Sequence, residues 1–400
     1  PSDPAVMADP FPVYARLRDE DPVHWSPSVK SWIVTRYDDV RDLLLSDHLS
    51  VNRLVRFYTA RPPEEAALLR DLIHYLNLWL AFRDPPDHTR LRRIMRHAFT
   101  APAIERMRPN IVEITEMLLD RLETRGAARV DLIREFALQL PAFVIMDLLD
   151  VPRDRLDDFK AWSDDMAVFI GGARNATDKY TRAARGCRKM SAYFRDLVAE
   201  RRRDPRPSFL MDLIEAQDDG DSLTDDELVA TCILVLFAGH ETTTNLIGNA
   251  ALLLLRHPDQ LASLRADPGR IHGAIEEVLR YDGPTNALVR EVAEDHVLHG
   301  RHLREGDRVF VMVNSANRDP RQFSEPERFD ITRTQNRHLT FGQGIHLCLG
   351  AKLAREEGRV AVQALFERFP ELALDPEEPP EWLDAMVPRG TRRLPVRLKG

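Results

Sequence analysis

The chain has 400 residues, of which 44% are hydrophobic and 30% charged, a composition typical of a soluble globular protein. Its formal net charge of −8 argues against nucleic acid as the main partner, because phosphate binding needs a basic surface. Three cysteines in so long a chain do not form a disulfide framework, and the N-terminus shows no signal peptide, so we expect a protein of the reducing cytoplasm.

Patterns along the chain predict mostly helix, with one strand-rich part. Helical patterns occur, in chain order, at 38–44, 88–99, 104–125, 193–203, 228–255, 271–281 and 351–369. Strand patterns occur at 32–35 and within 287–313. Residues 61–83 are apolar and aromatic without clean periodicity. The length predicts two domains or one large domain with a smaller lobe, and no linker clearly divides the chain.

The most apolar helical pattern, 228–255, has a polar middle. Thr224 and Glu227 have the spacing of a capping box, which would open the helix. His240 and Glu241 interrupt the apolar residues, and lipid would penalise these side chains at the centre of a span. We therefore expect a long buried helix and no membrane segment.

Within that helix, residues 238–244 read Ala-Gly-His-Glu-Thr-Thr-Thr. Glycine and β-branched threonine are poor helix formers, and a distortion held in mid-helix often marks a functional site. Threonine also bonds back to the carbonyl one turn earlier, which predicts a bulge that admits a ligand or water. The alternative is a solvated patch on a surface helix, which the apolar flanks disfavour.

Cys348 lies in a glycine-rich loop directly before the last predicted helix. A helix N-terminus stabilises a thiolate through the helix dipole and free backbone N–H groups. Gly342, Gly344 and Gly350 permit backbone conformations that are closed to other residues. Such a sulfur suits metal ligation, and haem iron is the best-known metal for which one cysteine suffices.

Other roles for Cys348 stay open at this point. The plainest is a buried, inert cysteine. A nucleophilic cysteine with His346 as its base is another, although residues two apart at a helix start do not easily face each other. Zinc is disfavoured because no second ligand pair has zinc spacing, and phosphate because the glycines do not form a dinucleotide fingerprint.

Two further pairs are weak signals alone. Glu277 and Arg280 lie three apart on one helix face, where pairing is common and individually worth little. His88 and Arg92 lie four apart in a strongly basic helix, and Arg matches carboxylates well. A solvated basic helix is the plain alternative for the second pair.

Together and in this order, these motifs resemble those of the cytochrome P-450 superfamily, the haem-thiolate monooxygenases, and in particular its soluble bacterial branch. The resemblance covers essentially the full length. Residues 341–350 match the family pattern Phe-Gly-x-Gly-x-His-x-Cys-x-Gly at every fixed position, and 238–243 match its oxygen-activation segment. Glu277 and Arg280 match its Glu-x-x-Arg pair. Residues 326–329, Pro-Glu-Arg-Phe, match the segment whose Arg joins that pair in a structural triad.

The resemblance implies a mainly α fold with a small β-rich lobe, a helix-dominated prism around a buried haem. It implies a single domain over 1–400, with the β-rich lobe mainly from 20–60, 285–313 and 380–400. The expected cofactor is haem b, iron protoporphyrin IX, with an axial thiolate.

The resemblance also assigns roles to residues by motif position. Cys348 would be the axial metal ligand, and Glu241 and Thr242 would deliver protons during oxygen activation. The haem propionates would meet His88, Arg92, Arg290 and His346. Further cofactor contacts are expected from Ala238, Gly239, Phe341, Gly342 and Gly350. Glu277, Arg280 and Arg328 would be structural.

The family's variable substrate lining falls on mostly apolar residues here. The expected contacts are Leu78, Trp79, Ala81, Leu234, Phe237, Asn286, Leu288 and Val387. An apolar pocket with few polar groups is the usual design for small molecules, with Thr285 and Asn286 as polar handles. Simple core packing is the alternative for each of these residues.

The expected activity is insertion of one atom of dioxygen into a lipophilic small molecule, by hydroxylation or epoxidation. Oxidative coupling at the same haem site is an alternative. A non-enzymatic haem sensor is another, but it has no need of Glu241 and Thr242. A hydrolase or transferase with a cysteine nucleophile is a third.

Electrons must come from a separate protein, because three cysteines cannot hold an iron–sulfur cluster as well as haem. We expect a ferredoxin-type donor with its reductase, and a monomer that binds neither nucleic acid nor membrane. Such donors are acidic, so docking is expected on the cysteine side, where basic residues would gather. These are Arg92, Arg93, Arg96, Lys352 and Arg355.

Overall fold

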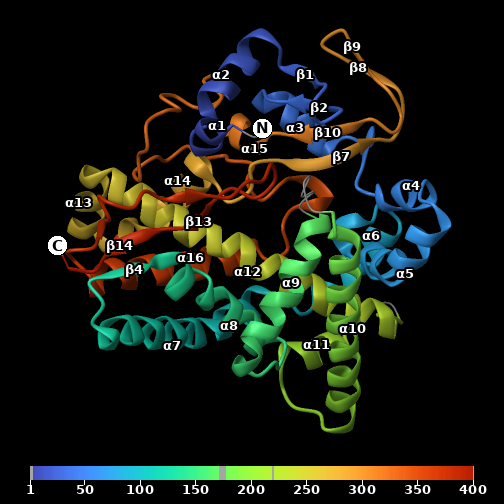
Figure 1. Cartoon of the computed structure of the whole chain (residues 1–400), viewed down its shortest axis with the longest axis horizontal. Coiled ribbons are helices and arrows are strands. Elements are labelled where there is room, and N and C mark those ends of the chain that lie inside the picture. Colours follow the sequence, from blue (N-terminus) through green and yellow to red (C-terminus); the bar gives the residue numbers. More distant parts are fainter. Residues whose placement is uncertain (1–2, 171–176, 219, 400) are drawn as a thin grey trace. The chain divides into compact units, whose positions relative to one another are not determined.

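The computed structural model describes residues 3–170, 177–218 and 220–399, and helices make up most of it (Figure 1). Its α-helices are α1 Pro4–Ala8, α2 Phe11–Glu20, α3 Tyr37–Leu45, α4 Leu54–Thr59, α5 Pro63–Asn77, α6 Asp87–Met95, α7 Ala101–Arg125, α8 Gln139–Leu148, α9 Leu156–Ile170, α10 Lys179–Arg203, α11 Phe209–Glu215, α12 Asp225–Arg256, α13 Pro258–Ala266, α14 Ile271–Asp282, α15 Val313–Ala316 and α16 Ala351–Arg368. Shorter helical turns are η1 Leu80–Phe82, η2 Ile133–Ala137, η3 Arg153–Arg155, η4 Pro268–Arg270 and η5 Gly344–His346.

The strands are short. They are β1 Val23–Ser26, β2 Ser31–Val34, β3 Leu49–Ser50, β4 Arg129–Asp131, β5 Gln217–Asp218, β6 Asp221–Ser222, β7 Leu288–Val292, β8 His296–Leu298, β9 Arg301–Leu303, β10 Arg308–Val311, β11 Ala373–Leu374, β12 Glu381–Trp382, β13 Thr391–Arg393 and β14 Pro395–Arg397. The largest sheet has the strand order β1-β2-β10-β7-β3.

The chain divides into two compact units. Unit 1 comprises Pro1–Leu49, Met107–Pro141 and Glu241–Gly400, and unit 2 comprises Ser50–Arg106 and Ala142–His240. The five-stranded sheet, except for the end of β3, and the cysteine loop belong to unit 1, whereas α5, α6, α9 and α10 belong to unit 2. Whether residues 1–400 act as a single domain stays a prediction.

The five-stranded sheet joins the two segments that the sequence marked as strands. β10 pairs in parallel with β2 and antiparallel with β7. Val34, Val309 and Val311 are fully buried and form part of its core. Because β7 is fixed in register against β10, Arg290 lies opposite Val309, and the sheet holds this expected haem contact in place.

The long helix α12 begins at the predicted capping box. The Glu227 amide donates to Thr224 Oγ1 at 3.2 Å, and the Thr224 amide donates to a Glu227 carboxylate oxygen at 2.9 Å. The segment 238–244 is α-helical throughout, so the expected bulge does not interrupt the helix. Within the described residues, no helix is long and apolar enough to cross a membrane.

Helix α5 lies within residues 61–83, a segment without clean periodicity in the sequence. Its buried residues include Leu69, Leu72, Ile73 and Leu76, which recur three and four apart on one face. The aromatic residues that follow Asn77 belong to a turn and to η1, not to the helix. Reading both stretches as one segment obscured the helical repeat.

Candidate functional site

The cysteine loop of unit 1 is closed by its own backbone. The Cys348 amide donates to the Phe341 carbonyl at 2.9 Å, and the Gly342 amide donates to the Leu339 carbonyl at 2.8 Å. Gly342 and Gly344 have φ of +72° and +70°, in the left-handed region that favours glycine. The two glycines therefore shape a tight turn that ends just ahead of α16.

Cys348 differs from the other two cysteines in exposure. Cys187 and Cys232 are buried, whereas Cys348 is exposed. Burial raises the pKa of both buried thiols to about 12, so at neutral pH each remains protonated. A thiolate ligand must be deprotonated, which leaves Cys348 as the cysteine suited to ligation.

Neighbouring elements of unit 1 pack closely on this loop. A β-carbon added to Gly344 would lie 3.0 Å from Leu45 of α3, and one added to Gly342 would lie 3.6 Å from Leu288 of β7. Gly344 thus serves close approach as well as backbone conformation, whereas a β-carbon on Gly342 would make only ordinary van der Waals contact. Gly350 differs, since its φ is −83° and a β-carbon there would meet nothing within 4 Å.

Behind the loop, Arg355 of α16 is already engaged. Its Nε lies 2.6 Å from Glu276, and its guanidinium carbon lies 4.4 Å from the centre of the Phe341 ring. His338 Nε2 lies 3.2 Å from the same carboxylate. Burial alone would raise the pKa of Glu276, but hydrogen bonds from His338 and Arg355 outweigh it and lower the pKa to about 2. Arg355 is therefore a structural cation and not the free docking charge expected from sequence.

The expected Glu277–Arg280 pair is present, and Arg333 joins it. Arg280 donates to both Glu277 oxygens, at 2.7 and 2.8 Å, and both side chains are fully buried. Arg333 Nε lies 3.2 Å from Glu277. The Arg328 side chain is instead 59% exposed and lies 3.6 Å from Glu325. The prediction that the Arg328 side chain completes the triad is therefore wrong.

The physical reason is the demand of a buried carboxylate. Glu277 also accepts from the Asp330 amide at 2.9 Å and from Asn336 Nδ2 at 3.2 Å, so several donors converge on it. Arg328 contributes only its carbonyl, which accepts from Arg280 at 3.1 Å. No motif quoted from the sequence marked Arg333.

In α12 the three consecutive threonines differ in exposure. Thr243 and Thr244 are 3% and 6% exposed, whereas Thr242 is exposed. Four residues earlier and therefore on the same helix face, Ala238 is also exposed, although the helix is otherwise mostly buried. The exposed face of α12 thus carries Ala238 and Thr242, two residues of the matched motif. Thr243 and Thr244 are buried and do not share this exposure.

The other residues of this segment have structural explanations. A β-carbon on Gly239 would lie 2.6 Å from Ile145 of α8, so glycine permits that close contact within unit 2. His240 Nδ1 lies 2.7 Å from the Leu236 carbonyl. Burial lowers the pKa of His240, which is therefore neutral at pH 7.

The basic helix α6 of unit 2 begins at an anchored turn. The Asp84 carboxylate accepts from Ser50 Oγ and from the Val51 amide. His88 is 1% exposed, and burial, followed by the charge of Arg92, lowers its pKa. At neutral pH His88 is thus an uncharged imidazole, and Arg92 supplies the positive charge of the pair.

Asn286, expected as a polar handle for substrate, is largely committed within unit 1. Its Nδ2 donates to the Tyr14 hydroxyl at 2.6 Å and to the Met386 carbonyl at 3.2 Å, and its amide donates to the Val387 carbonyl at 2.8 Å. Burial raises the pKa of Tyr14 to about 12. Asn286 and Val387 are therefore neighbours, but the Asn286 side-chain donor serves the fold.

The expected substrate residues of unit 2 lie on three segments. Leu78 and Trp79 follow α5, Ala81 lies in η1, and Leu234 and Phe237 lie in α12. Trp79 and Phe237 meet, with ring centres 5.5 Å apart. Trp79 is 2% exposed, whereas Ala81 is exposed.

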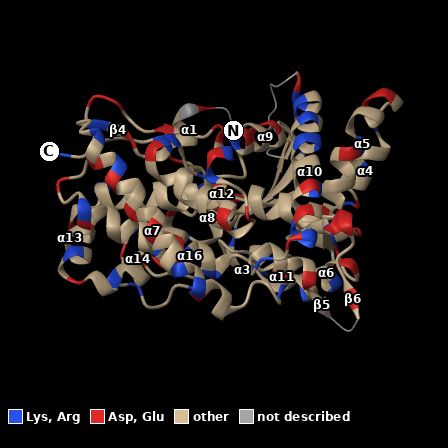
Figure 2. Cartoon of the chain, turned by 90° about the horizontal axis from the view of Figure 1, so that it is seen from below, with Lys and Arg blue, Asp and Glu red and all other residues tan. Residues whose placement is uncertain are grey.

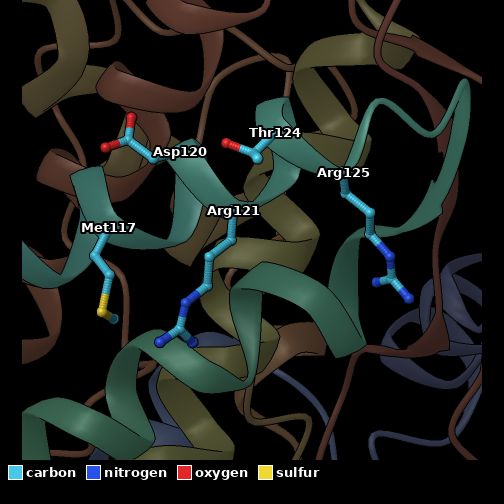
Figure 3. Close-up of a pocket in the computed structure, with 5 residues that line it drawn as sticks. All are labelled: Met117, Asp120, Arg121, Thr124 and Arg125. Atoms are coloured by element: carbon cyan, nitrogen blue, oxygen red, sulfur yellow. The ribbon is translucent and has the colours of Figure 1, made fainter.

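A separate pocket lies along α7 in unit 1, lined by Met117, Asp120, Arg121, Thr124 and Arg125. Figure 3 shows the Arg121 and Arg125 side chains on one side of the helix and Asp120 on the other. Arg125 lies 2.7 Å from Glu135. None of the motif residues lines this pocket, and it is not part of the candidate site.

Residues 43–394 match the family model described as cytochrome P-450. Cytochrome P-450 107B1 of Saccharopolyspora erythraea is 42% identical, with 99% of this chain and 96% of the relative aligned. Vitamin D(3) 25-hydroxylase of Pseudonocardia autotrophica is also 42% identical, over 98% of this chain and 94% of the relative.

The fold has close counterparts among solved structures. A myxobacterial cytochrome P-450 in complex with myristic acid has a TM-score of 0.90 and 35% identity, and the match covers 100% of this chain and 98% of the other. This likeness confirms the predicted fold class, which is mainly α with small β-sheets.

Proposed function

The chain belongs to the cytochrome P-450 family and is a haem-thiolate monooxygenase; from that premise we propose that it binds haem b and that the Cys348 thiolate would ligate the iron. Bound haem supplies the activation of dioxygen and the insertion of one oxygen atom into the substrate. The observation that carries the assignment is Cys348 itself, the exposed cysteine at the end of a closed glycine turn.

The residues around Cys348 fit such a group. The turn directly precedes α16, whose N-terminal dipole favours a thiolate over a thiol. Positive φ at Gly342 and Gly344 keeps the turn tight. By motif position, Phe341, Gly342, His346 and Gly350 contact the cofactor from this loop, as do Ala238 and Gly239 from α12.

The haem propionates are proposed to bind Arg92, Arg290, His88 and His346. Arginine forms charge-assisted hydrogen bonds with carboxylates, and these outweigh those from neutral donors. His88, being neutral, contributes an N–H donor without a charge. Replacement of Arg92 would therefore weaken cofactor retention more than replacement of His88.

Thr242 and Glu241 are proposed to hold and deliver protons. Thr242 presents a hydroxyl on the exposed face of α12, and Glu241 is the adjacent carboxylate. A hydroxyl both donates and accepts, so Thr242 can pass a proton between water and a second acceptor without changing charge. The buried Thr243 and Thr244 are not suited to this exchange.

The substrate is proposed to be a lipophilic small molecule that undergoes hydroxylation or epoxidation. Leu78, Trp79, Leu234, Phe237 and Leu288 offer apolar surface of the kind that lines such pockets. A relative is named for hydroxylation of vitamin D(3), and a structural counterpart holds myristic acid. Both molecules are largely apolar with a polar end.

Bacterial cytochromes P-450 use redox partners, and for this chain we propose a ferredoxin with its reductase. We also propose that the chain is a monomer and that it acts in the cytoplasm. Figure 2 shows acidic and basic residues interspersed along the helices, so the net charge of −8 does not prevent local basic surface. Three residues are exposed: Arg93 of α6, Arg96 directly after α6, and Lys352 of α16. These residues, in place of Arg355, are the proposed docking charges.

The absorption spectrum of the reduced protein under carbon monoxide tests the assignment. A strongly red-shifted Soret band indicates a thiolate ligand, as proposed. A Soret band without that shift would show haem held by another ligand, and a colourless protein would remove the haem assignment altogether.

A further inference from the structure

Trp79 of unit 2 carries a buried donor that the fold does not use. The residue is 2% exposed, and its Nε1 has no hydrogen-bond partner among the residues that the structure describes. A buried N–H without an acceptor costs free energy, because water that bonded it in the unfolded chain has been removed. Most buried donors are paired, so an exception needs an explanation.

Trp32 shows that this chain does pair indole donors. Its Nε1 donates to Asp307 at 2.9 Å. Trp25 is 39% exposed and reaches water directly. The unpaired state of Trp79 is thus a property of its position and not of tryptophan in this fold.

Aromatic neighbours hold the Trp79 ring. Phe82 stacks on it with ring centres 5.9 Å apart and an interplanar angle of 15°, and Phe237 lies at 5.5 Å and 42°. Arg53 lies over the Phe82 ring at 4.8 Å, which extends the stack. An indole packed in this way presents its N–H in a fixed direction at little cost in conformational entropy.

One of these neighbours lies beside the motif segment of α12. Phe237 immediately precedes Ala238 and Gly239, and it lies one helical turn before Glu241 in α12. By contrast, the Asn286 side-chain donor is already bonded to Tyr14 and Met386. Among the expected substrate contacts, Trp79 therefore provides a side-chain donor that no protein acceptor occupies, whereas the unpaired atom of Asn286, Oδ1, is an acceptor.

We propose that Trp79 determines substrate specificity by donating a hydrogen bond from Nε1 to a carbonyl or hydroxyl oxygen of the lipophilic substrate. This rests on the proposed monooxygenase function and adds a polar requirement to it. A site built to bond an oxygen rejects the hydrocarbon that lacks it, because its buried donor then stays unpaired.

The test compares matched ligand pairs: cyclopentadecanone with cyclopentadecane, and tetradecanol with tetradecane. Wild type and Trp79→Phe are titrated, and the haem spin-state change gives each dissociation constant. We expect Trp79→Phe to weaken binding of the oxygenated members by about five- to tenfold and of the hydrocarbons by less than about twofold. Trp162→Phe, at another buried tryptophan of unit 2, serves as the control and should keep the wild-type preference.

A second readout does not depend on haem. With ¹⁵N-labelled tryptophan, the indole signal that disappears in Trp79→Phe is assigned to Trp79. The Trp79 indole signal should shift downfield when cyclopentadecanone is added and should not shift when cyclopentadecane is added. The proposal is overturned if wild type has no preference for the oxygenated members or binds none, or if the preference survives in Trp79→Phe. Loss of the red-shifted carbon monoxide band in wild type would instead refute the haem-thiolate function.

Discussion

At the scale of single residues, solvent exposure distinguishes residues of the same type that the sequence alone does not distinguish. Three threonines stand side by side in α12, yet only Thr242 is exposed. Three cysteines are present, yet burial raises the pKa of two of them to about 12. Motif order selects Thr242 and Cys348, whose roles stay predictions, and burial gives the physical reason why their neighbours do not substitute for them.

Thr242→Ala should divert electrons from product to hydrogen peroxide. Without the hydroxyl, proton delivery loses its relay, and we expect product formed per electron to fall several-fold. Parallel assays of electron-donor oxidation, hydrogen peroxide formation and product formation measure this ratio. Thr243→Ala, at a buried neighbour, should retain wild-type coupling, and equal uncoupling in both variants would remove the role assigned to Thr242.

Glu276 should make stability depend on pH in the acid range. Its pKa is lowered from an ordinary value of 4.5 to about 2 by His338 and Arg355, which outweigh burial. A lowered pKa means that the stabilisation is complete above pH 4.5 and is lost as the pH falls toward about 2. The stability advantage of wild type over Glu276→Gln should therefore narrow across that window in denaturant titrations. A difference in unfolding free energy between the two proteins that stays constant from about pH 6 to about pH 2, whatever its size, would contradict this prediction.

At the scale of elements, helices and strands with clear repeats were predictable, and side-chain partners were not. Helices α6, α7, α14 and α16 and the capping box of α12 follow from local patterns, which residues nearby in sequence determine. Arg333, which contacts Glu277, lies in an irregular segment that is far from Glu277 in the sequence. No local repeat encodes that contact, so the motif search selected Arg328, whose side chain faces solvent.

Arg333→Gln and Arg328→Gln distinguish the two assignments. Removing Arg333 leaves the buried Glu277 with less compensation, and we expect a loss of about 1–3 kcal/mol in unfolding free energy. Arg328→Gln should change it by less than about 0.5 kcal/mol, because its pair is exposed. Chemical denaturation measures both. A larger loss at Arg328 would restore the assignment made from sequence.

At the scale of the whole molecule, the fold and the class of chemistry are those of the family, whereas the partner and substrate contacts of this chain stay proposals. The family likeness spans nearly the entire chain, so the fold class was predictable from four motifs. Arg355, expected from the sequence as a docking charge, is bound to Glu276, and the other expected docking residues stay predictions. Net charge and composition describe the surface as a whole and cannot show which cations are already paired.

Charge reversal tests the proposed docking residues. Arg96→Glu and Lys352→Glu should each slow electron transfer from an acidic ferredoxin by about tenfold at low salt, and the loss should shrink as salt screens the charges. Stopped-flow reduction measures the rate, and the substrate-induced spin-state change should stay as in wild type. Unchanged rates in both variants would reject these residues as docking charges.

The central claim is that Cys348 is the thiolate ligand of the haem. The most direct measurement is the reduced carbon monoxide spectrum of Cys348→Ser beside Cys187→Ala, which removes a buried thiol. We predict that Cys348→Ser loses the strongly red-shifted Soret band and that Cys187→Ala keeps it at wild-type intensity per folded protein. A Cys348→Ser protein that retains the red-shifted band would contradict the account.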